Sequence, residues 1–214
     1  MSKKFLKFVF IYLATITFAI SEELIIFNFT EEEYKSLKVK KIKNETTYIV
    51  GSNENGNYLK AQAKGTASGL GKEIKIDLMK TPFLNVTWKI EKDLAGINEN
   101  SKKGHDYAAR VFVIKKTGAT ALSNRAINYV FSSNNPIGKY WRSPFTKKSI
   151  DYVLSTTQKN FNEWVTVKAN VRKHFKKLHD IDVNEIEGVA IMTDTDNSKL
   201  PEIAYYQNIY FSSE

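Results

Sequence analysis

The 214-residue chain contains no cysteine, and this absence excludes several kinds of protein. Disulfide bonds cannot stabilise it, so the folded form depends on its hydrophobic core. A bacterial lipoprotein anchor is excluded because it needs a cysteine after an N-terminal apolar run. The three histidines share no metal-ligand spacing, and without cysteine ligands a zinc site is not expected.

Several familiar sequence signatures are missing as well. The chain has no nucleophile elbow, phosphate-binding loop or dinucleotide fingerprint. It also lacks an internal repeat, a low-complexity linker or a shift in composition that would mark a second domain. We therefore expect one domain over residues 22–214, without a nucleotide cofactor.

The first 21 residues have the pattern of a signal peptide. Residues 1–7 hold three lysines, residues 8–18 form an apolar run too short to span a bilayer comfortably, and residues 19–21 fit the small-x-small cleavage pattern. An uncleaved N-terminal anchor is the alternative. We expect cleavage before Glu22 and an exported protein, periplasmic or extracellular, with no transmembrane span after cleavage.

The chain is basic, with a formal charge of +9, of which the first 21 residues contribute three lysines and no acids, leaving +6. The remaining surplus is spread over surface lysines, which for an exported protein favours a solvated face over a nucleic-acid partner. Weak attraction to anionic glycans or membrane surfaces stays open.

Short stretches that alternate apolar and polar residues dominate the chain. Residues 84–90 are the clearest example, and about ten such stretches are separated by turn signals every eight to twelve residues. Helical patterns occur twice, at 30–37 and 170–179. This pattern predicts an all-β protein with a single β-sandwich of jelly-roll (galactose-binding-like) type and two short helices.

The strand that ends in acidic residues, 188–198 (GVAIMTDTDNS), is the best candidate site. Side chains alternate across a strand, so Met192, Asp194 and Asp196 are expected on one face. Carboxylates at the end of an apolar strand need a cation, donors or a metal. Asn197 follows directly and joins the candidate ligand-binding residues.

Asp106 and Arg110 are the second half of this candidate site. They are four apart on an apolar strand and are predicted to share a face, with the small Ala108 between them. We predict that Arg110 pairs with Asp194 or Asp196. Such a pair either fixes the sheet internally or lies in a ligand groove.

Two chemical alternatives use the same acids. Asp106, Asp194 and Asp196 could supply a general acid and base for glycoside hydrolysis. Asp194, Asp196 and Ser198 also begin like a calcium loop, but the spacing is not that of an EF-hand, because Lys199 stands where that loop needs glycine. A calcium site built from distant loops stays open. No other cofactor is expected.

Two adjacent aromatic residues, Tyr140 and Trp141, lie in a loop-like stretch rich in proline and glycine. Exposed rings would offer a stacking platform for sugars, whereas a buried Trp141 would anchor the loop. Trp88 and Trp164 lie in alternating strands and are expected in the core.

Five segments together resemble the bacterial "domain of unknown function 3047" family. They are Ala67–Leu70, Asp106–Val113, Ile127–Ser133, Ile191–Ser198 and Tyr205–Phe211, in family order. The resemblance implies an exported protein with a fold like jelly-roll carbohydrate-binding modules, and it implies no activity. Val86 departs from the tryptophan frequent in the family, and His105 departs from a second acid before Asp106.

Three hypotheses about function follow. The first is a non-catalytic module that binds a glycan or cell-envelope polymer through Asp106, Arg110, Asp194, Asp196, Asn197, Tyr140 and Trp141. The second is a polysaccharide-acting enzyme. The third is a structural or partner-binding envelope protein. The oligomeric state is left open.

Overall fold

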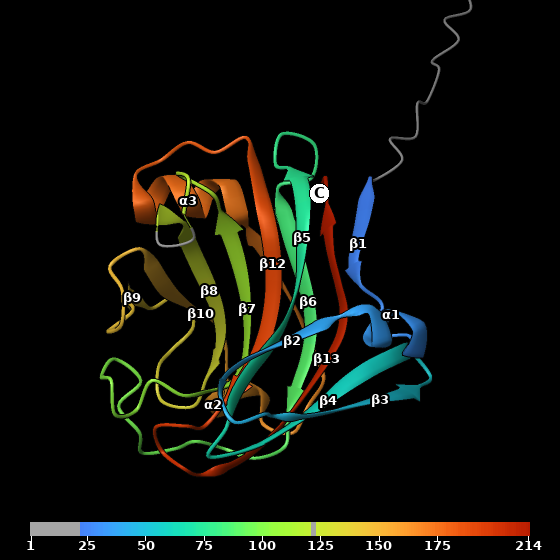
Figure 1. Ribbon diagram of the computed structural model, residues 1–214, viewed down its shortest axis with the longest axis vertical. Helices are drawn as coiled ribbons and strands as arrows, with labels where there is room; N and C mark the ends of the chain where they lie inside the picture. Colours follow the sequence, from blue (N-terminus) through green and yellow to red (C-terminus); the bar gives the residue numbers. More distant parts are fainter. Residues whose placement is uncertain (1–21, 121–122) are drawn as a thin grey trace, which may run out of the picture.

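A computed structural model of the chain describes residues 22–120 and 123–214. The predicted signal peptide, residues 1–21, lies outside the described residues. The described part is built from two β-sheets that pack face to face (Figure 1). This arrangement confirms the predicted all-β sandwich.

One sheet has six strands. They are β1 (Glu23–Phe27), β3 (Thr47–Asn53), β4 (Gly56–Lys64), β6 (Phe83–Ile90), β11 (Val165–Asn170) and β13 (Pro201–Ser212). Their order is β11-β6-β13-β4-β3, and β1 pairs with the last residues of β13.

The other sheet has seven strands. They are β2 (Lys38–Lys43), β5 (Ala67–Asp77), β7 (Tyr107–Lys115), β8 (Arg125–Ser132), β9 (Tyr140–Arg142), β10 (Ser149–Thr156) and β12 (Glu185–Asp194). Their order is β2-β5-β12-β7-β8-β10-β9, so the acidic strand β12 lies between β5 and β7 near the middle of the sheet.

The core lies between the inner faces of the two sheets. Trp88, Tyr206 and Phe131 are among its largest fully buried side chains, which confirms the core position predicted for Trp88. The Trp88 indole N–H donates to the Ser155 hydroxyl at 2.8 Å, linking one sheet to the other. Trp164, in contrast, is half-buried and contacts Tyr58 and Tyr205.

Within residues 22–120 and 123–214, three helices connect strands: α1 (Glu31–Ser36), α2 (Thr157–Asn160) and α3 (Val171–His179). The first and third match the predicted helices. Thr30 caps α1 by accepting the Glu33 backbone N–H at 3.1 Å. In α3, the predicted apolar stripe is confirmed, because Val171, Phe175 and Leu178 are buried in the core.

Two strands and one helix were not expected from the sequence. Strand β2 reads KVKKIK and resembles a solvated lysine run, and β9 is a three-residue edge strand in the predicted loop. Helix α2 has only four residues, too few for a periodic pattern. No helix in the described ranges is long and apolar enough to cross a membrane.

Candidate functional site

The predicted carboxylates come together at one end of β7 and β12. Asp194 is the last residue of β12, Asp196 lies in the turn that follows, and Asp106 directly precedes β7. One carboxylate oxygen from each residue lies within 4.8 Å of the others. The sequence therefore identified a real cluster, formed by segments that are almost ninety residues apart.

Arg110 and Asp194 form a buried ion pair. Arg110 Nε donates to Asp194 Oδ1 at 2.9 Å, and Arg110 Nη2 donates to Asp194 Oδ2. The two residues are 4% and 2% exposed, so both charges are almost completely removed from water. The predicted pairing of Arg110 is confirmed, with Asp194 as the partner.

A bulge changes which residues share the face of Arg110. Arg110 pairs with Met192 and Tyr107 with Asp194, and the register shifts between these pairs. Because Met192 and Asp194 share a face, Tyr107 lies on the Arg110 face instead of Ala108. Arg110 Cζ is 4.9 Å from the centre of the Tyr107 ring. The predicted position of Ala108 between Asp106 and Arg110 on that face is therefore wrong, because Ala108 lies in the core.

Asp106 holds the turn after β12. Its Oδ1 accepts the Asn197 backbone N–H at 3.1 Å and the Asn197 side-chain amide at 2.8 Å. Its Oδ2 accepts the Ser198 backbone N–H at 2.5 Å. Asp106 is fully buried, so these donors replace water around its carboxylate. It positions the loop that carries Asp196 and Asn197.

Opposing effects act on the pKa of the Asp194 carboxyl. Burial raises the pKa of the Asp194 carboxyl to about 7, and the neighbouring Asp106 and Asp196 act in the same direction. The Arg110 guanidinium opposes this increase by stabilising the carboxylate. Without Arg110, Asp194 would favour its protonated form.

The three acids do not present a donor set that fits calcium. Calcium takes six to eight oxygen ligands. Both oxygens of Asp106 already accept N–H groups, and both oxygens of Asp194 accept from Arg110. A cation would have to displace these donors and would lie beside the Arg110 charge. The arrangement favours a hydrogen-bonded cluster over the calcium site considered from the sequence.

A second buried network, not predicted from the sequence, lies beside this cluster. His105 Nε2 lies 2.8 Å from Asp151 Oδ2, and the Asn128 side-chain amide donates to Asp151 Oδ1 at 2.7 Å. The Asn128 Oδ1 atom is buried without a hydrogen-bond partner in the described structure. The available signal was a single polar residue within two otherwise apolar strands, INYVF and IDYVL.

These two networks form the floor of a hollow of about 320 Å³ on the outer face of the seven-stranded sheet. Phe145, 58% exposed, and Ile42, 66% exposed, contribute apolar surface. The hollow is lined by Ile42, Ala67, His105, Arg110, Phe112, Asn128, Ser143, Phe145, Thr146, Ser149, Met192, Asp194, Asp196 and Asn197. Four of the predicted site residues line it.

Tyr140 and Trp141 do not form a common platform. Trp141 pairs with Asp151 and packs against Tyr107 and Val153 on the outer face of the sheet. Tyr140 is 47% exposed and stacks on Tyr152. Because side chains alternate along a strand, Tyr152 lies on the opposite face of the sheet from its neighbour Asp151. Trp141 is half-buried, and its indole N–H has no hydrogen-bond partner among the described residues.

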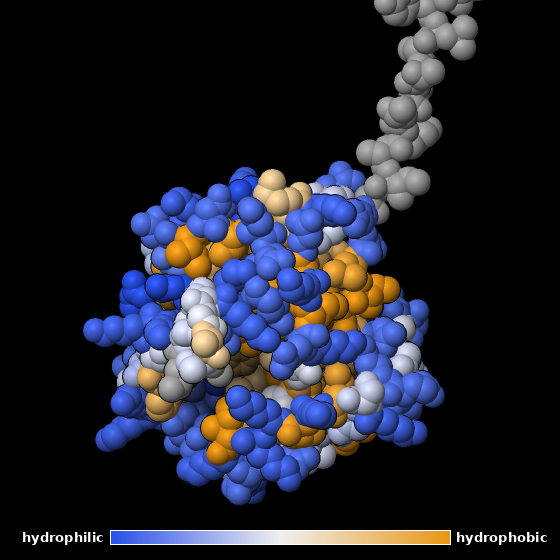
Figure 2. Space-filling view, turned by 45° about the horizontal axis from the view of Figure 1, so that its top comes forward, coloured by the Kyte–Doolittle hydropathy of each residue, from blue (hydrophilic) through white to orange (hydrophobic). Residues whose placement is uncertain are grey.

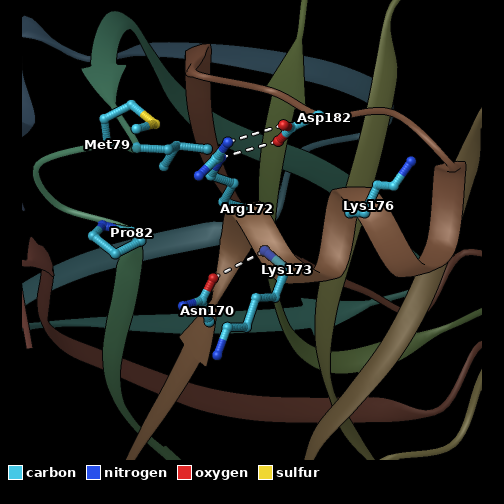
Figure 3. Close-up of a pocket in the computed structure, with 8 residues that line it drawn as sticks. Met79, Pro82, Asn170, Arg172, Lys173, Lys176 and Asp182 are labelled. Atoms are coloured by element: carbon cyan, nitrogen blue, oxygen red, sulfur yellow. Dashed lines mark hydrogen bonds and ion pairs between the residues drawn. The ribbon is translucent and has the colours of Figure 1, made fainter.

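Another hollow, of about 410 Å³, lies beside the start of α3 (Figure 3). Its charged groups are largely engaged with one another or with neighbours. Arg172 donates to both oxygens of Asp182, at 3.0 and 2.9 Å, and Lys176 pairs with Asp180 at 3.0 Å. The Asn170 side chain accepts the Lys173 backbone N–H and caps the helix. We therefore regard it as a structural feature.

The described chain is a two-sheet β-sandwich of jelly-roll type with a hollow on one outer face. The model of the family described as "Protein of unknown function (DUF3047)" matches residues 32–210, and the chain belongs to this family. The resemblance seen in the sequence is confirmed. A comparison with curated protein sequences finds no match.

Similar solved structures include two carbohydrate-binding modules and a domain of a bacteriophage tailspike protein. The family 30 carbohydrate-binding module of a cellulosomal cellulase of Clostridium thermocellum is 10% identical, with 90% of this chain and 98% of that chain covered and a TM-score of 0.51. TmCBM61 in complex with β-1,4-galactotriose is 7% identical, with coverages of 87% and 98% and a TM-score of 0.39. The enzymatically active domain of bacteriophage CBA120 tailspike protein 4 is 7% identical, with coverages of 88% and 21% and a TM-score of 0.44. The first of these supports the fold.

Proposed function

We propose that the chain is an exported, non-catalytic module that binds a glycan or cell-envelope polymer in the hollow of the seven-stranded sheet. The observation that carries this proposal is the pairing of exposed apolar side chains, Phe145 and Ile42, with a floor of buried polar groups. Sugars present apolar ring faces and hydroxyl groups, so a site for them needs both kinds of surface.

The polar floor suits hydroxyl groups. Asn128 lines the hollow, and its unpartnered Oδ1 can accept a hydrogen bond from a ligand hydroxyl. Asp196 is half-buried and also lines the hollow. The fold is similar to that of a carbohydrate-binding module, which is consistent with this use of the surface.

A catalytic role for the three acids is less well supported. A general acid or base must reach the reacting bond with a free oxygen. The oxygens of Asp106 and Asp194 are held by donors of the chain, and both residues are buried. We therefore place the acids in the framework of the binding site, and we propose no nucleic-acid partner.

Export is part of the same proposal. It depends on the N-terminal sequence, where the lysine-rich start, the short apolar run and the residues before Glu22 follow the pattern of a signal peptide. A polymer-binding module outside the cytoplasm would meet cell-envelope or environmental polysaccharides directly.

A binding screen with matched variants tests the proposal. The protein comprising residues 22–214 is titrated with soluble plant and bacterial polysaccharides by affinity electrophoresis and calorimetry. Phe145→Ala should weaken binding at least tenfold. Phe161→Ala should not, because Phe161 is 47% exposed but does not line the hollow. No binding to any polymer, or equal losses in both variants, would refute the proposal.

A further inference from the structure

The hollow is bordered by lysines on three different segments. On the edge strand β2, Lys38 pairs with Gly71 and Lys40 with Gly69. Gly69 in turn pairs with Met192, and Met192 with Arg110, so these residues form one row across the outer face. Since glycine has no side chain, nothing stands between Met192 and Lys40 in that row.

The other lysines lie on the opposite border. Lys102 places its ammonium group 5.8 Å from the centre of the Phe145 ring. Lys147 follows Thr146, which lines the hollow, and its carbonyl accepts from Arg142. Two borders of the hollow therefore carry exposed positive charge.

These cations are not neutralised by the protein itself. Lys38, Lys40, Lys102 and Lys147 are exposed and form no ion pair with any described acid. Other surface lysines do have acidic partners, as Lys41 does with Glu45. The border lysines are thus available to a negatively charged ligand.

The acids in the floor are engaged by donors of the chain, whereas the lysines stand at the border. Asp194 is paired with Arg110, Asp151 is held by His105 and Asn128, and Asp106 accepts three N–H groups. Asp196 is half-buried, and the Lys199 ammonium group donates to its backbone carbonyl. The floor accepts hydrogen bonds, while the border attracts anions.

We propose that the ligand is an acidic polysaccharide of the uronic-acid type, which presents hydroxyl groups to the floor and carboxylates to the border lysines. This inference rests on the proposed function and specifies its ligand class. One sugar acid carries both groups, and a polymer of such units would meet lysines on both borders at once. Separate weak contacts to exposed lysines add up along a polymer.

Each acidic polymer is compared with its own neutral form. Polygalacturonate and alginate are measured against the same polymers after carboxyl reduction, by calorimetry at low and high salt. We expect at least one acidic polymer to bind about tenfold more tightly than its reduced form, with affinity falling as salt rises.

Lysine variants test whether binding depends on the lysines at the border of the hollow or only on the positive charge of the protein as a whole. The Lys38→Met/Lys40→Met/Lys102→Met variant should lose roughly tenfold in affinity for the acidic polymer. The control Lys80→Met/Lys168→Met/Lys173→Met removes the same net charge from exposed lysines that pair with no described acid. Lys168 also contacts an aromatic ring, at 5.4 Å from the centre of Phe83, as Lys102 contacts Phe145 at 5.8 Å. The control should keep its affinity.

The outcomes distinguish the two proposals. If neutral polymers bind at the Phe145 site as tightly as acidic ones, the module binds glycans and the acidic preference is wrong. If both triple variants lose the same affinity, the attraction is unspecific and the inference is overturned. If no polymer binds, the proposed function itself fails.

Discussion

Arg110 and Asp194 join β7 and β12, two adjacent strands near the middle of the seven-stranded sheet, through a two-point ion pair that is almost completely buried. Removing one partner of such a pair leaves an uncompensated charge in the interior. The pair also lines the hollow, so it links the stability of the sheet to the shape of the proposed site.

The first prediction concerns this pair. Arg110→Met should lower the free energy of unfolding by about 3–5 kcal/mol, because it leaves Asp194 buried without its cation. Lys173→Met, at an exposed position on α3, should change it by less than about 1 kcal/mol. Denaturant unfolding of both variants provides the measurement.

The pH dependence of that variant gives an internal check. Burial raises the pKa of Asp194, and loss of Arg110 removes the opposing effect. A raised carboxyl pKa gives stability that is present at low pH and lost as the pH rises through the folded-state value. Arg110→Met should therefore lose less stability at pH 5 than at pH 8. An unchanged midpoint at both pH values would show that the pair does not stabilise the sheet.

The second prediction concerns Trp141, which packs against Tyr107, Val130 and Val153. Trp141→Ala should cost about 1–3 kcal/mol, less than a fully buried tryptophan because the residue is half-buried. Trp141→Phe should cost less, since it keeps the ring packing and removes an indole N–H that has no partner in the described part of the chain. Thermal and denaturant unfolding can rank the two variants. Full stability of Trp141→Ala would mean that Trp141 is a free platform and not an anchor.

The third prediction concerns Glu202, which lines a different hollow, of about 330 Å³. Burial raises the pKa of its carboxyl to about 9, and Asp93 acts in the same direction. The folded state thus prefers the protonated form, so stability from this group is present below its ordinary pKa of 4.5 and is lost as the pH rises toward 9. Glu202→Gln keeps the shape of the side chain and a hydrogen-bond donor, but its amide does not titrate.

The Glu202→Gln variant should therefore be more stable than the natural chain at pH 8 and similar to it at pH 4. The wild-type stability should fall between these pH values by an amount on the order of a few kcal/mol, and the variant should lack most of this fall. Unfolding midpoints across the pH range provide the measurement. Parallel curves for the two proteins would contradict the assignment.

Much of the fold could be predicted from the sequence because strand periodicity is a local property. The alternation in 84–90 and the apolar stripe of α3 both correspond to elements at the expected places. Strand β2 was missed because its lysines satisfy no alternation of apolar and polar residues. It becomes a strand by pairing with β5, a long-range interaction that its own residues do not reveal.

The site was predicted only in part, for a comparable reason. The Arg110–Asp194 pair followed from a charge inside an apolar strand and acids at a strand end. The bulge that puts Tyr107 on the same face depends on the register between β7 and β12, which alternation within one strand cannot reveal. Tyr140 and Trp141 were grouped by adjacency, but neighbouring residues of a strand face opposite sides.

The fourth prediction concerns export. The mature protein should begin at about Glu22, because the apolar run before it is short and is followed by small residues. Mass spectrometry of the protein recovered outside the cytoplasm identifies the first residue. Intact Met1 in the membrane fraction would instead support an uncleaved anchor.

The central claim is that the hollow beside Phe145 binds a polysaccharide. The most direct test is calorimetric titration of the 22–214 protein, Phe145→Ala and Phe161→Ala with the best polymer from the screen, after circular dichroism has shown all three to be folded. The natural chain and Phe161→Ala should bind with equal affinity, and Phe145→Ala should bind at least tenfold more weakly. Equal affinity in all three proteins would contradict this location of the site.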